Sequence, residues 1–177
     1  DYKLTGLAVF KENKILTTLK EKESILYNII TNNINNTILK YECEKDKYIS
    51  NKISEISTST EIEPKTNKLK LKIKGTATIS ELHCNYDLTN PKTIKEIEKN
   101  INKQITKDTN NIIKKFQNLN TDIFGFKDIY YKNNYKEFQN IKNNYDETFK
   151  NMQLEIKSNI KIIAKGNIEG DIYEMEN

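Results

Sequence analysis

The chain has 177 residues and a mass of 20.8 kDa, and with 36% hydrophobic and 31% charged residues its composition excludes low-complexity and collagen-like chains. The net charge is only +4, all 29 basic residues are lysines, and acidic residues are interspersed among them, so nucleic acid is not expected as a partner. Polar residues interrupt every apolar run before the roughly 18 to 20 residues of a membrane span. The sequence therefore predicts one globular domain over residues 1–177.

The N-terminal part predicts a strand followed by a helix. Residues 4–10 are almost wholly apolar, which is typical of a strand covered on both faces. Residues 11–14 form a polar turn, after which Thr17 or Thr18 can cap a helix that ends before the asparagine-rich residues 32–36. The apolar residues that recur at helical spacing there are Leu19, Ile25, Leu26, Ile29 and Ile30.

Three β-type segments follow, at residues 37–43, 48–63 and 68–79, with a turn at 64–67 between the last two. The third segment alternates between apolar residues and a row of lysines, which predicts a long antiparallel hairpin with one solvated face. The lysines of this row are Lys68, Lys70, Lys72 and Lys74. They are interpreted as that solvated face, with contact to phosphate or an anionic lipid surface as the alternative.

The second half predicts a long helix, an aromatic segment and a final strand. Asn90 or Thr89 can cap a helix of about 27 residues that begins at Pro91 and carries an apolar stripe from Ile94 to Phe116. Residues 119–122 interrupt it, and a further short helix carries apolar residues from Tyr135 to Phe149.

After Asn151 the period of two returns up to Ile168, so a final strand is expected to pair with one of the hairpin strands, and residues 171–177 read as a frayed tail. The fold class is α+β: an antiparallel β-sheet of about four to five strands with helices packed on one face.

Few residues point to chemistry. Cys43 and Cys84 have no metal-site spacing; buried free thiols are favoured, and a disulfide stays open if their strands are neighbours. His83 precedes Cys84 on a strand, where successive side chains point to opposite faces. Asp122 and Asp128 could act as an acid and base, but Asp122 is better explained as a helix cap. No catalytic residue, metal site or cofactor is expected, and an enzyme is improbable.

The aromatic segment is the most distinctive feature. Gly125 between two phenylalanines permits a positive φ, so both rings can turn toward one surface. One interpretation is that the segment closes the core beneath the long helix. The other is a contact patch for a protein partner, since clustered aromatic residues are common anchors. Its residues are Phe124, Gly125, Phe126, Tyr130 and Tyr131.

Five short segments together carry a family resemblance. They are residues 6–11 (GLAVFK), 83–92 (HCNYDLTNPK), 119–126 (LNTDIFGF), 135–138 (YKEF) and 145–149 (YDETF). In that order they resemble the C-terminal domain of the Ger(x)C spore germination proteins, the C subunits of nutrient germinant receptors. The resemblance covers essentially the whole chain.

The resemblance implies a non-enzymatic domain that acts in receptor assembly or signal transmission during spore germination. Its implied partners are the membrane-integral A and B subunits, on the outward-facing side of the spore inner membrane. The chain carries no signal peptide or lipobox, so it looks like the last domain only, and the lipid anchor is expected outside it rather than on Cys43 or Cys84. The alternative is a ligand-binding module that itself senses a small-molecule germinant.

Overall fold

A computed structural model describes residues 6–165, and the expectations for Leu4, Ile168 and residues 171–177 lie outside that range. Its elements follow in chain order. They are β1 (Gly6–Lys11), β2 (Lys14–Lys20), α1 (Glu21–Ile30), β3 (Thr37–Glu44), β4 (Lys47–Glu63), η1 (Pro64–Thr66), β5 (Lys68–Leu82), α2 (Pro91–Asn118), α3 (Phe126–Asn133), α4 (Tyr135–Ile141), η2 (Lys142–Asn144), α5 (Tyr145–Lys150) and β6 (Gln153–Lys165).

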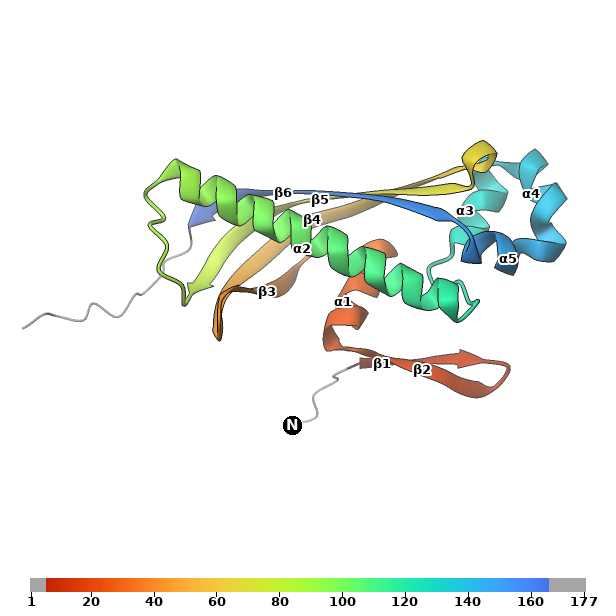
Figure 1. The fold of residues 1–177 in the computed structure, drawn as a ribbon, viewed down its shortest axis with the longest axis horizontal. Coiled ribbons are helices and arrows are strands. Elements are labelled where there is room, and N and C mark those ends of the chain that lie inside the picture. The colour runs from red at the N-terminus through yellow and green to blue at the C-terminus, as the bar shows by residue number, and fades with distance from the viewer. Residues whose placement is uncertain (1–5, 166–177) are drawn as a thin grey trace, which may run out of the picture.

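The main sheet has four strands in the order β3-β4-β5-β6, and α2 lies along one of its faces (Figure 1). The predicted α+β class is therefore confirmed. The final strand pairs with a hairpin strand as expected, but it runs parallel to β5, with Lys68 opposite Gln153. The sheet is mixed rather than antiparallel because α2 carries the chain back to the end where β5 began, so β6 must restart there.

The core lies between α2 and the apolar face of β4 and β5. Asn90 caps α2 by accepting a hydrogen bond from the Lys92 backbone N–H at 2.9 Å, and Pro91 occupies the first turn, both as predicted. The alternation of β5 is also confirmed, because its apolar side chains are buried and face the core. The five side chains concerned are Leu69, Leu71, Ile73, Ala77 and Ile79, each at most 1% exposed.

The N-terminal region differs from the prediction. Thr17 and Thr18 lie in strand β2, which pairs with β1 in a separate two-stranded sheet, and the helix begins only at Glu21. A residue of the first turn caps the N-terminus of α1: the Glu23 carboxylate accepts a hydrogen bond from the Lys20 backbone N–H at 2.9 Å. The expectation that the first strand is covered on both faces is wrong for the described chain, since most of β1 is exposed.

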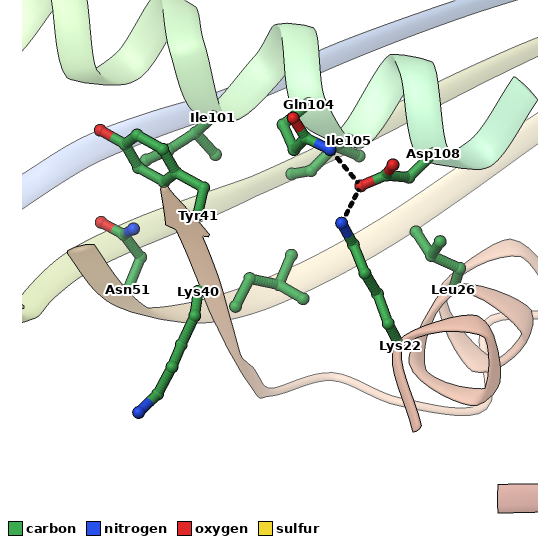
Figure 2. Close-up of a pocket in the computed structure, with 10 residues that line it drawn as sticks. Lys22, Leu26, Lys40, Tyr41, Asn51, Ile101, Gln104, Ile105 and Asp108 are labelled. Atoms are coloured by element: carbon green, nitrogen blue, oxygen red, sulfur yellow. Dashed lines mark hydrogen bonds and ion pairs between the residues drawn. The ribbon is translucent and has the colours of Figure 1, made fainter. Parts of the chain in front are cut away.

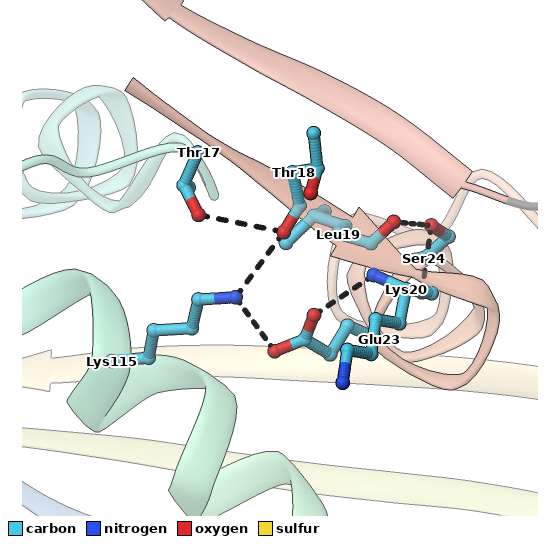
Figure 3. Close-up of polar contacts among 7 residues, drawn as sticks. All are labelled: Thr17, Thr18, Leu19, Lys20, Glu23, Ser24 and Lys115. Carbon is cyan, nitrogen blue, oxygen red and sulfur yellow. Dashed lines mark hydrogen bonds and ion pairs between the residues drawn. The ribbon is translucent and has the colours of Figure 1, made fainter. Parts of the chain in front are cut away.

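The hairpin of β1 and β2 is tied to α2 by Lys115. Figure 3 shows the Lys115 Nζ between the Thr18 carbonyl oxygen, at 3.3 Å, and the Glu23 carboxylate, at 2.8 Å. Burial opposes ionisation of Glu23, but the hydrogen bonds from Lys115 and from the Lys20 backbone outweigh it and hold the pKa of Glu23 below its ordinary value.

The two cysteines form a disulfide, which corrects the expectation of free thiols. Cys43 lies near the end of β3 and Cys84 just beyond β5, with their Cα atoms 6.4 Å apart, inside the usual range for a bridge. Both segments border the start of β4: Glu42 of β3 is paired with Tyr48, and the His83 backbone N–H donates to the Tyr48 carbonyl at 3.0 Å. Sequence spacing could not reveal this approach.

Candidate partner-contact surface

The aromatic segment begins in a turn organised by Asp122. Its carboxylate accepts hydrogen bonds from the backbone N–H groups of Phe124, at 3.0 Å, and Lys127, at 2.8 Å, and from the Tyr145 hydroxyl at 2.9 Å. Gly125 has a φ of 76°, the positive value that its position between two phenylalanines predicted. Asp122 thus caps the start of α3, as the cap interpretation has it, and Asp128 lies exposed in the first turn.

Three residues of the predicted contact patch are buried. Phe124 is 5% exposed, Phe126 1% and Tyr130 3%. The rings of Phe124 and Phe126 stack at 5.2 Å between centroids, and Phe124 meets Phe116 of α2 edge-on at 5.7 Å. In the folded domain these three side chains lie in the core, which supports the interpretation that the segment closes the core beneath the long helix.

Tyr131 and Tyr135 form the exposed end of the same cluster. Tyr131 is 48% and Tyr135 55% exposed, and their rings meet edge-on at 5.4 Å. Behind them Tyr131 packs on the buried Phe138 at 5.6 Å, and Phe138 packs on Tyr145 at 6.2 Å. The pair is therefore a surface aromatic feature held on a packed base, which is the usual setting of an interface anchor.

Sequence reasoning included Tyr131 and exposed Gly125 in the patch but missed Tyr135, which it assigned to an apolar helical stripe. The spacing of four residues between the two tyrosines was a usable signal, although the chain kinks at Asn134 between α3 and α4.

Burial raises the pKa of the Tyr145 hydroxyl, and the neighbouring Asp122 carboxylate raises it further, so this phenol stays protonated and keeps its hydrogen bond. Tyr145 is 2% exposed and packs on Phe138, which in turn packs on Tyr131. Its bond to Asp122 joins α5 to the turn before α3, which fixes the base on which Tyr131 and Tyr135 stand.

The lysine row of β5 divides into two halves. Lys68 lies 3.9 Å from the Glu155 carboxylate, and Lys70 lies 3.7 Å from Glu61 and 3.5 Å from Glu63. These acids compensate the charge at the start of the strand, where the nearby carboxylates also raise the pKa of Lys70 against the effect of burial.

The second half of the row is different. Lys72 and Lys74 are exposed and lie opposite Ser59 and Ser57 on β4. On the other side, Lys72 is aligned with Lys157 of β6. Any anionic surface would therefore meet Lys72 and Lys74 rather than the whole row of four.

A small internal pocket lies between α2, α1 and the edge strand β3 (Figure 2). The picture shows Tyr41 and Asn51 on one side and the ion pair of Lys22 with Asp108 on the other. Asn51 is fully buried, and neither atom of its amide group has a hydrogen-bond partner in the part of the chain that the structure describes. The pocket volume is about 20 Å³, enough for about one water molecule.

The described residues 6–165 contain no group of three or more His, Cys, Asp or Glu side chains placed to hold a metal ion. Among the same residues, no helix is long and apolar enough to cross a membrane. His83 does not converge with Cys84 on a nucleophilic pair, because the sulfur of Cys84 is in the disulfide.

Comparison with known proteins places the chain in a family. The family model described as "Spore germination B3/ GerAC like, C-terminal" matches residues 5–166. Spore germination protein GerQC of Bacillus cereus is 23% identical over 92% of this chain and 46% of its own length. Spore germination protein KC of Bacillus subtilis is 24% identical over 91% of this chain and 41% of its own length.

The fold agrees as well. The crystal structure of the GerBC protein superposes with a TM-score of 0.76 at 18% identity, covering 91% of this chain and 52% of that one. The chain spans less than half the length of the two curated relatives and about half of the GerBC chain. The resemblance found in the sequence is thereby confirmed: the chain belongs to the family of GerAC-like spore germination proteins and corresponds to their C-terminal domain.

Proposed function

We propose that this chain is a non-enzymatic binding domain of a spore germinant receptor, acting in receptor assembly or signal transmission. The observation that carries the proposal is the Tyr131–Tyr135 pair, two exposed aromatic rings on a packed base in a chain of the germinant receptor C-subunit family. Tyrosines with a rigid, apolar body and a polar tip are frequent hot spots of protein interfaces. The proposed partners are the membrane-integral A and B subunits.

The proposed location is the outward-facing side of the spore inner membrane, with a lipid anchor outside this chain. In that arrangement the domain stands beside the membrane-integral subunits, and the corner formed by α3 and α4 is available to them. The location and the lipid anchor rest on the family resemblance, whereas the corner rests on the exposure and packing of its tyrosines.

The test is capture of the solubilised membrane-integral subunits by the purified domain. The variant carries Tyr131→Ala and Tyr135→Ala, and the control carries Tyr48→Ala, an exposed tyrosine on β4 with 43% exposure. We expect the double variant to retain a cooperative thermal transition and to capture at least about tenfold less, because removal of a hot spot costs 2 kcal/mol or more. Equal capture by the double variant and the control would contradict the proposal.

The alternative, a module that senses a small-molecule germinant, has one observation in its favour: the buried Asn51 amide without a partner facing a pocket. At about 20 Å³ the pocket must widen before it accepts a nutrient. A thermal-shift screen against amino acids and nucleosides tests this, with Asn51→Leu as the variant that removes the polar group. A ligand-dependent rise in melting temperature that Asn51→Leu abolishes would favour the alternative.

A further inference from the structure

The hairpin of β1 and β2 presents an apolar outer face. Phe10 and Ile15 lie opposite each other across the two strands and are 62% and 63% exposed. Beside them on the same face, Ala8 and Thr18 form the next exposed pair. The opposite face is turned to the domain, because Leu19 there is only 2% exposed.

Contacts at both ends of the hairpin hold its outer face toward solvent. At the turn end, the Lys11 Nζ donates to the Asn120 carbonyl at 3.2 Å and the Thr121 hydroxyl at 3.3 Å. Toward the other end, Lys115 holds the Thr18 carbonyl (Figure 3). Gly6 lies so close to the Leu19 carbonyl that a side chain there would overlap it. Phe10 and Ile15 therefore cannot turn inward without breaking these contacts.

Both faces of β1 are apolar, a pattern typical of strands covered on both sides. On β5, by contrast, lysines alternate with buried apolar residues, so only one face of that strand is apolar. A cross-strand pair of one aromatic and one β-branched residue, such as Phe10 and Ile15, stabilises the pairing of its two strands. Within residues 6–165 nothing shields this pair.

The relatives contain polypeptide that lies outside this domain. The matching family model is a C-terminal one, and this chain aligns with only 46% and 41% of the two curated relatives. The relatives of this family therefore have a comparable length of polypeptide before this domain. Two domains on one polypeptide have a high effective concentration for each other, so a small apolar patch is enough to dock them.

We propose that the outer face of the β1–β2 hairpin, centred on Phe10 and Ile15, is the docking surface for the polypeptide that precedes this domain in the full-length protein. The surface it meets is apolar, and the contact sets how the C-terminal domain is oriented on the rest of the subunit. This contact is separate from the Tyr131–Tyr135 corner, which lies on α3 and α4.

Hydrogen exchange of the hairpin amides tests the proposal, measured in this chain alone and in the full-length protein that carries it. The variant combines Phe10→Thr with Ile15→Thr, which keeps β-forming residues in the strands. The control is Ile163→Thr, an equally exposed apolar residue on β6, at 67%. A cooperative melt of each protein confirms that it is folded.

We expect the amides of residues 6–20 to exchange at least about tenfold more slowly in the full-length protein than in the chain alone. The double variant should remove that difference and speed proteolytic cleavage between the domains, while the control should do neither. Equal exchange in the two proteins would overturn the proposal. So would slowing in the chain alone that depends on its concentration, which would indicate a second copy, or on vesicles with anionic lipid, which would indicate a membrane surface.

Discussion

The aromatic corner, formed by α3 and α4 with the turn before α3, and the β1–β2 hairpin both carry apolar side chains. Most of the aromatic rings at the corner are buried, whereas the outer face of the hairpin is exposed. For Phe124 and Phe126 the sequence left open whether they close the core or contact a partner, and both rings are buried. The first strand was expected to be covered on both faces, but in the hairpin that it forms with β2 Phe10 is 62% exposed. Both regions carry apolar side chains, so hydrophobicity alone does not decide which of the two regions is buried.

The difference lies in what the chain supplies nearby. At the corner, three short helices and the end of α2 bring aromatic rings together with neighbouring centroids 5.2 to 6.2 Å apart, so each ring covers the next. The hairpin has only two strands and one neighbouring face, so it can bury only one of its sides. An apolar pattern indicates that a surface is to be covered, and the topology decides whether this chain provides the cover.

Replacing Phe126 with alanine should have the largest effect on stability, because it disrupts the packing of the aromatic corner. The ring is 1% exposed and contacts Phe124 and Phe149, so its removal leaves a cavity. We expect a loss of about 3 to 5 kcal/mol in the free energy of unfolding, measured by denaturant titration. A loss below about 1 kcal/mol would mean that the ring is not part of the core.

Asp122→Ala should weaken the same corner less. It removes the acceptor for the Phe124 and Lys127 backbone N–H groups and leaves the buried Tyr145 hydroxyl without its partner. We expect about 1 to 3 kcal/mol of destabilisation, with faster amide exchange confined to residues 122–133. Unchanged exchange in that segment would contradict the role of Asp122 as a cap.

Glu23→Gln should loosen the attachment of the hairpin in a pH-dependent way. Because the pKa of Glu23 is lowered in the folded chain, the unfolded chain binds its proton first as the pH falls. The stabilisation by Glu23 is therefore fully present above its ordinary pKa of 4.5 and is lost as the pH falls through the folded value.

The stability difference between wild type and Glu23→Gln should be at most about 1 kcal/mol at pH 7, where Lys115 and the carboxylate are both charged. It should shrink progressively when thermal melts are repeated at successively lower pH below 4.5, because the carboxylate is lost once the pH falls through the lowered pKa of the folded state. A difference that stays constant over this range would show that charge on Glu23 does not matter.

Phe10→Thr in the chain alone should have the smallest effect and sharpens the contrast with Phe126. The side chain is mostly in water, so we expect the free energy of unfolding to change by no more than about 0.5 kcal/mol. A loss comparable to that of Phe126→Ala would mean that this chain itself covers the hairpin.

Much of the fold follows from local signals. The alternation of β5, the Asn90–Pro91 start of α2 and its interruption at residues 119–122 each reflect a short-range rule of spacing or capping. Strand β2 was missed because Thr17 and Thr18 also suit a helix cap, and only pairing with β1 decides between the two. The parallel direction of β6 and the Cys43–Cys84 disulfide depend on how distant segments return, which no local pattern encodes.

The candidate contact surface was only partly predictable. The sequence showed that aromatic residues gather between residues 123 and 149, but not which of them α2 covers. Tyr131 faces solvent whereas Tyr130 beside it is buried, a difference set by one step of rotation along α3. Likewise, the lysine row was visible, but the acids that compensate Lys68 and Lys70 come from the neighbouring strands β4 and β6.

The proposed contact of this domain with the receptor is tested most directly by hydrogen exchange of the chain with and without the solubilised membrane-integral subunits. We predict slower exchange across residues 126–141, which form α3 and α4 and carry Tyr131 and Tyr135. Unchanged exchange there, or slowing confined to other parts of the domain, would contradict the claim that the aromatic corner is the contact surface.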